Sequence, residues 1–351
     1  MSLPFVIRAG KKAKAKLLKD GFHQDQFGAM LGASGGPKWF ILAGLDRYLA
    51  GEFWPGRDRP LQLLGSSAGG WRMAAHACAE PVAAIARFRD HYHRLTYAED
   101  ASAADVTASS KAMIDTLLGK GGSGQILANP IMKLHLITAG CRGPLASDSR
   151  GLQLPGLGLA ALANLVHRRS LGAFFSRGVF HVDDRPHWLE TGDLPTEYLR
   201  LTETSLPLAL EATGAIPLVL QGVRGIPGSR HRVHRDGGII DYHFDMQLRP
   251  DGLVLYPHFY SHPIPGWFDK GLTWRKPKAA HYDNVVILAP HPELVAGLPG
   301  GKLSDRTDFA RLTDAERIAC WQQVMDAGER MAEAFANSLR SGSWTRALAD
   351  Y

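Results

Sequence analysis

The residues best suited to chemistry in this sequence form the segment Gly65-Ser66-Ser67-Ala68-Gly69, which fits the pattern G-x-S-x-G. An apolar run at residues 61–64 precedes it and predicts a buried strand, and a helical pattern follows from Trp71. A serine between such elements sits on a strained turn, so the residues two positions away must lack side chains that would clash. Glycine at both positions predicts Ser67, rather than Ser66, as a nucleophile. Taken alone, the segment also fits a small-residue turn without function.

A second glycine-rich turn, Ser34-Gly35-Gly36-Pro37-Lys38, has the backbone donors that such a nucleophile needs. Consecutive glycines let N–H groups converge on one point, as an oxyanion hole requires. Pro37 has no N–H, so the candidate donors are Gly35 and Gly36. A phosphate-binding P-loop does not fit, because Pro37 and Trp39 stand where it needs glycine and Ser or Thr. The alternative is a strand-to-helix turn without function.

Asp236-Gly237-Gly238 is the third segment with catalytic potential, and Asp236 is a candidate general base. Taken alone, an Asp-Gly-Gly sequence is most often a turn. Asp251-Gly252 is a rival with a similar pattern, but it lacks the second glycine. The choice of Asp236 therefore depends on the combination of the three segments.

Together the three segments resemble the patatin-like phospholipase family. Its members pair a G-x-S-x-G serine with an aspartate in D-G-G or D-G-A, after a glycine-rich D-G-G-G-x-R-G oxyanion segment. In this sequence Ser67 falls on the nucleophile and Asp236 on the dyad aspartate, in the same order along the chain. Gly35 and Gly36 fall on the last two oxyanion glycines, and Lys38 takes the arginine position. The segment ALEATGAIP at 209–217 is similar to the A-x-x-A-S-x-A-x-P segment that precedes the family's aspartate.

The resemblance covers about residues 5–245 and implies a three-layer α/β/α sandwich around a mainly parallel sheet. We expect one domain over residues 1–351, in which residues 246–351 form a C-terminal extension with a further strand and a long helix. Lys38 and four glycines are expected to support the site: Gly65, Gly69, Gly237 and Gly238. Ala33, Ser34 and Trp39 replace the family's Asp, Gly and Gly, so we expect an altered entry to the oxyanion loop.

The resemblance implies a serine lipid acyl hydrolase, similar to a phospholipase A or an esterase, with a Ser-Asp dyad and neither a cofactor nor a metal. Its substrate would be a lipid or fatty-acyl ester. The same dyad would suit an acyl-thioester hydrolase or an acyltransferase, and a degenerate copy of the fold would suit a lipid- or protein-binding module. The presence of Ser67, Asp236 and both oxyanion glycines favours an enzyme. A dyad without histidine predicts activity that persists below about pH 6, unless burial raises the pKa of the carboxylate.

Elsewhere the order strand, tight turn, helix predicts a mostly parallel sheet with helices on its faces. Helices are predicted at 11–19, 38–49, 71–78, 81–95, 159–168 and 314–339, and strands at 28–31, 61–64, 133–138 and 284–288. The pattern weakens at 96–130, where the glycine-rich residues 119–124 predict a flexible segment.

The 351-residue chain carries a formal charge of +6. A lysine cluster is compatible with peripheral contact with an anionic membrane surface, and equally with a solvated helix face: Lys11, Lys12, Lys14, Lys16 and Lys19. No nucleic-acid motif accompanies the cluster, so nucleic acid is not an expected partner. Three cysteines without paired spacing, together with no signal peptide and no apolar run of about 18 residues, predict a cytoplasmic protein.

Overall fold

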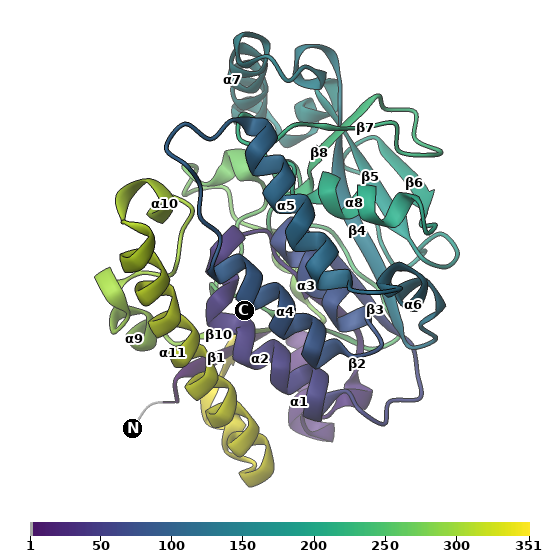
Figure 1. The fold of residues 1–351 in the computed structure, drawn as a ribbon. Coiled ribbons are helices and arrows are strands. Elements are labelled where there is room, and N and C mark those ends of the chain that lie inside the picture. Colours follow the sequence, from purple (N-terminus) through teal and green to yellow (C-terminus); the bar gives the residue numbers. More distant parts are fainter. Residues whose placement is uncertain (1–2) are drawn as a thin grey trace.

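Short apolar runs form the strands of one large sheet in the computed structural model, which describes residues 3–351 (Figure 1). The strands are β1 (Phe5–Ala9), β2 (Phe27–Gly32), β3 (Leu61–Ser66), β4 (Met132–Cys141), β5 (Phe175–His181), β6 (Thr196–Arg200), β7 (Val223–Arg224), β8 (Val233–Asp236), β9 (Leu253–Pro257), β10 (Val285–Pro290) and β11 (Leu348–Asp350). Their order across the sheet is β11-β1-β10-β9-β2-β3-β4-β5-β6, and β8 pairs with β4 and β7.

The centre of this sheet is parallel, because β10, β9, β2, β3 and β4 all run in one direction. By contrast, β1 is antiparallel to β10, and β5 and β8 are antiparallel to β4. Every residue of β2 and β10 is buried, as expected for parallel strands covered on both faces, and this explains why both strands read as continuous apolar runs. The predicted α/β fold with a mainly parallel sheet is confirmed.

Helices flank the sheet. Those within the described residues are α1 (Lys11–Asp20), α2 (Ala43–Tyr48), α3 (Ala68–Ala77), α4 (Pro81–His93), α5 (Ala103–Leu118), α6 (Gly122–Ala128), α7 (Arg150–Val166), α8 (Ser205–Thr213), α9 (Pro292–Ala296), α10 (Asp308–Arg311) and α11 (Asp314–Ser341). In Figure 1, α2, α3, α4, α5 and α11 lie in front of the sheet and pack against their neighbours. Within residues 3–351, every helix is too short or too polar to cross a lipid bilayer.

The structure differs from the sequence prediction in three segments. The helix predicted at 38–49 begins as a 3₁₀ helix, Gly36–Leu42, and becomes α-helical only in α2. The weak region 96–130 contains α5 and α6, and α5 begins with a capping box between Ser102 and Asp105. The helix predicted at 159–168 is α7, which already starts at Arg150, because tertiary contacts outweigh the loop preference of its glycines and proline.

The C-terminal residues 246–351 belong to the same sheet. Strands β9 and β10 lie between β1 and β2, and β11 pairs with β1. The further strand predicted at 284–288 is β10, and the predicted long helix is α11. This helix packs on α2 and on the 3₁₀ helix that follows the glycine-rich turn. Residues outside the family resemblance therefore support the predicted site.

Candidate active site

Ser67 lies on a sharp turn between β3 and α3. Its backbone has φ 54° and ψ −134°, a combination that residues with side chains rarely adopt. The Ser67 N–H donates to Thr213 Oγ1 at 2.9 Å, and the Thr213 hydroxyl donates to the Ile137 carbonyl at 2.6 Å, which holds the turn in place. The Ser67 hydroxyl therefore stands at the N-terminus of a ten-residue helix, where the helix dipole favours negative charge.

Close backbone contact makes glycine necessary on both sides of this turn. A Cβ on Gly69 would lie 1.9 Å from the Gly32 carbonyl oxygen, and a Cβ on Gly65 would lie 2.5 Å from the Gly69 carbonyl oxygen. Neither Gly65 nor Gly69 has a positive φ, so these positions require space rather than backbone freedom. The steric reason for expecting glycine at both positions is confirmed.

Ser67 and Asp236 meet although 169 residues separate them. Ser67 Oγ donates a 2.7 Å hydrogen bond to Asp236 Oδ2, and both residues are buried. Asp236 ends β8, whose antiparallel pairing with β4 places it opposite Thr138. Its N–H donates to the carbonyl of Ala215 in the ALEATGAIP segment, and its Oδ1 accepts from the Gly238 N–H at 2.7 Å. The carboxylate is thus held with one oxygen on the serine hydroxyl.

Ser66 points away from this pair. Its hydroxyl donates to the Asp241 carbonyl at 2.9 Å and lies 2.5 Å from the Ser34 hydroxyl. Ser34 stands where the family has glycine, and it joins the glycine-rich turn to the end of β3. A Cβ on Gly238 would lie 2.5 Å from Ser34 Oγ, so Gly238 leaves room for this contact. At the entry to the oxyanion loop, the replacement of the family's glycine by Ser34 therefore adds a hydrogen bond to Ser66.

Gly35 and Gly36 line, together with Ser67, a cavity of about 110 Å³. Neither glycine N–H donates a hydrogen bond to a described residue. Gly36 has φ 56°, in the left-handed region, and a Cβ on Gly35 would lie 2.4 Å from the Phe259 ring. Glycine is thus required at one position for its conformation and at the other for space. Two amides without a partner, on a turn that lines the same cavity as Ser67, are candidate donors to an oxyanion.

The same cavity collects side chains from segments without a motif. Part of its wall is apolar, and residues after Asp236 add aromatic and charged groups: Tyr242, Trp267, Lys270, Asp305 and Arg306. The sequence alone did not mark Tyr242, Lys270, Asp305 and Arg306 as site residues, because their loops and short 3₁₀ turns carry no periodicity or motif. Lys38, which was predicted, pairs with Asp305 and so ties the glycine-rich turn to the C-terminal part of the chain.

Burial sets the acidity of the candidate base. It raises the pKa of Asp236 to about 6, although the hydrogen bonds from Ser67 and Gly238 act in the opposite direction. The charges of Arg306 and Lys270 also act to lower this pKa, but burial outweighs them. The expected activity below about pH 6 assumed that burial does not raise this pKa. With the raised pKa, the Asp236 carboxylate is protonated below about pH 6, so we expect activity to fall there.

Two cations face the cavity without a carboxylate partner among the described residues, Lys270 and Arg306. Much of Lys270 is exposed, but its ammonium lies 4.1 Å from the centre of the Tyr242 ring. Burial of this ammonium, followed by repulsion from Arg306 and Lys38, lowers the pKa of Lys270 to about 8. For Asp305, partial burial acts to raise the pKa, but Lys38 outweighs it and holds that pKa well below its usual range. The cavity consequently has an excess of positive charge.

No histidine among residues 3–351 lines the cavity. His243 and His258 are buried, each accepts a backbone hydrogen bond at Nδ1, and burial lowers the pKa of both. The rival Asp251 is exposed and precedes β9. Because β9, β2 and β3 are parallel, Asp251 lies at the opposite edge of the sheet from Ser67. Of the two candidate aspartates, only Asp236 is therefore in contact with Ser67.

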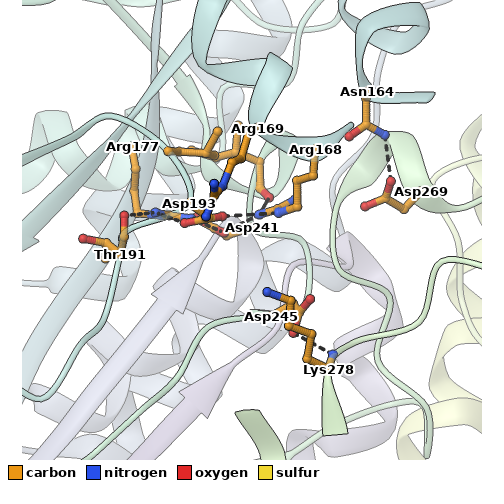
Figure 2. Close-up of polar contacts among 12 residues, drawn as sticks. Asn164, Arg168, Arg169, Arg177, Thr191, Asp193, Asp241, Asp245, Asp269 and Lys278 are labelled. Carbon is orange, nitrogen blue, oxygen red and sulfur yellow. Dashed lines mark hydrogen bonds and ion pairs between the residues drawn. The ribbon is translucent and has the colours of Figure 1, made fainter. Parts of the chain in front are cut away.

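A buried ion-pair network anchors the segment that follows β8 (Figure 2). Arg177 on β5 donates to the Asp241 carboxylate at 2.5 and 2.9 Å, and Arg168 donates to it at 3.0 Å. Asp193 accepts from both arginines. Because the Asp241 carbonyl also accepts the Ser66 hydroxyl, the network fixes this segment relative to the nucleophile turn.

A scan against protein-family models and a search of curated proteins both find no match to this chain. The resemblance to patatin-like phospholipases therefore depends on the motifs and on the geometry that joins them. Among residues 3–351, no group of three His, Cys, Asp or Glu side chains is arranged to hold a metal ion.

Asp236 is predicted to lower stability at neutral pH. Its pKa is about 6 in the folded chain and 3.8 in the unfolded reference, so folding disfavours the ionised form as the pH rises between these values. The difference corresponds to ~3 kcal/mol at pH 7. We expect Asp236→Asn to raise the melting temperature at pH 7 by several degrees and to give no gain below about pH 4. Thermal unfolding across this pH range measures the effect.

The same pKa predicts that kcat/KM of the unmodified protein falls as the pH drops through about 6, because only ionised Asp236 accepts a proton. Asp251→Asn is the matched control, since its carboxylate is exposed, and it should change neither the pH profile nor the melting temperature. An Asp236→Asn variant no more stable than the parent at pH 7 would contradict the raised pKa.

The glycine-rich turn is predicted to act through its amides and not through the Lys38 side chain. Gly36→Ala should reduce kcat about a hundredfold, because a side chain at φ 56° strains the turn and displaces a donor. Lys38→Met should cost less, because it removes only the ion pair with Asp305. Gly158→Ala, at a position with open space around it, is the control. Hydrolysis rates on a short-chain nitrophenyl ester measure both effects. An inactive Lys38→Met together with an active Gly36→Ala would assign the essential role to the Lys38 side chain and not to the Gly36 amide.

Proposed function

We propose that this protein is a serine acyl hydrolase that cleaves lipid or fatty-acyl esters with a Ser-Asp dyad. The observation that carries the proposal is the 2.7 Å hydrogen bond from Ser67 Oγ to Asp236 Oδ2, in a cavity that Gly35 and Gly36 also line. A hydroxyl bonded to a base at a helix N-terminus is the arrangement that nucleophilic catalysis needs. The order of the three motifs along the chain supports the same function.

In the acylation step, Ser67 Oγ attacks the ester carbonyl carbon and Asp236 accepts the hydroxyl proton. The carbonyl oxygen becomes an oxyanion, which takes hydrogen bonds from the N–H groups of Gly35 and Gly36. As the intermediate collapses, the bond to the leaving alcohol breaks and Asp236 gives its proton to the departing oxygen. The acyl group remains on Ser67 as an ester.

In the second step, water attacks this acyl ester while Asp236 removes one of its protons. The intermediate collapses to release the carboxylic acid, and the proton returns from Asp236 to Ser67 Oγ. A carboxylate with a pKa of about 6 suits both steps, because it is ionised at neutral pH and is a stronger base than an exposed aspartate.

The charge in the cavity favours a substrate that carries an anionic group near the ester. Lys270 and Arg306 face the cavity without a carboxylate partner among the described residues, whereas Lys38 is paired with Asp305. Phosphate and carboxylate groups are the natural partners of such cations. A phospholipid has both the ester and the phosphate that this arrangement suits.

Two alternatives keep the same site. An acyl-thioester hydrolase or acyltransferase would use the same dyad with a thiol leaving group or with an alcohol in place of water. A lipid- or protein-binding module would use the cavity without turnover. The hydrogen-bonded dyad and the raised pKa of Asp236 favour the enzyme, because a binding module has no need of an ionisable carboxylate at this position.

Ser67 is predicted to be the only serine labelled rapidly by a fluorophosphonate. Ser67→Ala should abolish labelling and hydrolysis, and Asp236→Asn should reduce kcat about a thousandfold or more, because an amide cannot accept the proton. Asp251→Asn is the control and should stay close to the parent. Mass analysis of labelled peptides and rates on a nitrophenyl ester test these expectations. Labelling of Ser66 would assign the nucleophile to that residue instead. A parent protein that is folded but does not react with the probe would favour the lipid- or protein-binding module.

The two cations are predicted to select substrates by charge. Arg306→Gln and Lys270→Gln should each raise KM about tenfold or more for an ester that carries a carboxylate or phosphate, because a charge-assisted hydrogen bond is lost. Neutral esters of equal length should show little change. The exposed Arg346→Gln is the control. Equal effects on charged and neutral esters would assign both cations to structure and not to substrate binding.

A further inference from the structure

Helix α7 presents an apolar face to solvent. It supplies six of the ten large hydrophobic residues that are exposed within residues 3–351: Leu152, Leu154, Leu159, Leu162, Leu165 and Val166. Leu162 is 64% exposed and Val166 83% exposed. No charged residue occurs from 151 to 166. A monomeric soluble protein rarely exposes a continuous apolar surface of this kind without a partner.

The polar residues of α7 lie on its buried side, which fixes this orientation. Gln153 Oε1 accepts from the Leu218 N–H at 2.9 Å, and Asn164 Nδ2 donates to Asp269 Oδ1 at 2.7 Å (Figure 2). Arg275 donates to the carbonyl of Asn164 at 2.6 Å. Rotating the helix to bury its leucines would break these bonds, so the apolar face is held outward by its own polar contacts.

The face lies at the edge of the sheet that carries the dyad. Strands β3 and β4 are parallel, so Ser67, which follows β3, and α7, which follows β4, lie beyond the same ends of these strands. On its buried side, Leu157 of α7 belongs to one apolar cluster with Ile239, and Ile239 lines the cavity. Figure 1 shows α7 at one end of the molecule and α1 toward the other.

Unpaired cations flank the face. Arg150 begins α7 and Arg169 follows its end; both are exposed and make no side-chain ion pair with a described residue. Trp274, 67% exposed, and the exposed Lys276 flank Arg275, which is bonded to the carbonyls at the end of the helix. An apolar helix face bordered by arginine, lysine and tryptophan matches the interface of a bilayer with anionic headgroups.

We propose that α7 docks on the surface of an anionic lipid bilayer with its leucine face in the boundary between headgroups and acyl chains. A second copy of the chain fits less well, because a symmetric contact would bring the unpaired arginines of both helices together. The docking itself does not rest on the proposed hydrolase activity, although it would direct the edge that carries the dyad toward lipid.

The lysine cluster of α1 is a weaker candidate for lipid contact. Three of its five lysines are in ion pairs: Lys12 with Asp283, Lys14 with Asp350 and Lys16 with Asp20. Leu18 is its one large exposed apolar side chain, whereas Ala13 and Leu17 are buried. A helix with most of its lysines paired and one large exposed apolar side chain lacks the apolar area that membrane binding needs.

Vesicle flotation with the full-length protein tests the docking. The parent should bind vesicles of phosphatidylcholine mixed with phosphatidylglycerol, and bind phosphatidylcholine alone more weakly. The double variant L159D/L162D should lose at least about tenfold in binding, because it places two charges where apolar side chains enter the interface. Leu18→Asp on α1, with an exposure of 57% against 56% for Leu159, is the matched control and should bind as the parent does.

Arg150→Gln combined with Arg169→Gln should remove the preference for phosphatidylglycerol and leave weak binding to phosphatidylcholine. Unchanged flotation of L159D/L162D, or an equal loss in Leu18→Asp, would overturn the proposal. A parent that dimerises in light scattering, becomes monomeric in L159D/L162D and does not float would assign the face to self-association and overturn it as well. Flotation requires no turnover, so a failed hydrolase assignment and a failed docking surface give different results. Unchanged melting temperatures establish that the variants fold.

Discussion

The site depends on one close approach, in which the first turn of α3 touches the end of β2 with no side chain between them. A Cβ on Gly69 would overlap the Gly32 carbonyl oxygen. Because the two backbones are in contact, the loop that leaves β2 passes the Ser67 hydroxyl and brings the amides of Gly35 and Gly36 into the same cavity. A methyl group at this contact would force apart the proposed nucleophile and the proposed donors, however well the rest of the site were built.

Asp236 at the end of β8 and Asp241 shortly after it are both buried carboxylates, but they have different partners. Asp241 is compensated by direct bonds from Arg168 and Arg177, so it serves as an anchor. Asp236 is equally enclosed but has no cation in contact, only the hydroxyl of Ser67 and the amide of Gly238. Burial without a contacting cation raises the pKa of the Asp236 carboxyl, so its carboxylate is a stronger base than an exposed one. Asp241 thus anchors the segment that carries the proposed base.

On the outer surface near this edge of the sheet, α7 has its uncharged polar side chains buried and most of its large apolar side chains exposed. In α7 the polar side chains are turned inward to partners such as Asp269 and Leu218, and the leucines remain outside. The cavity close to this helix contains cations without carboxylate partners. Apolar surface and unpaired positive charge are both unfavourable for an isolated soluble chain, and both suit contact with anionic lipid. The proposed substrate class and the proposed docking surface thus come from independent observations at one edge.

The sequence by itself determined the parts of the site that depend on local geometry. Strained turns and close backbone contacts tolerate few residue types, so Ser67, Gly65, Gly69, Gly35 and Gly36 were visible as motifs, and short apolar runs marked the buried strands. Only the tertiary structure decided the rest. The pKa of Asp236 depends on burial, and Lys270, Asp305 and Arg306 lie on loops that meet at the cavity only after folding. The motifs had already favoured Asp236 over Asp251, and strand direction adds that Asp251 lies at the opposite edge of the sheet. The outward face of α7 was not predicted either, because the sequence indicated this helix only from residue 159, and only long-range contacts fix which side is buried.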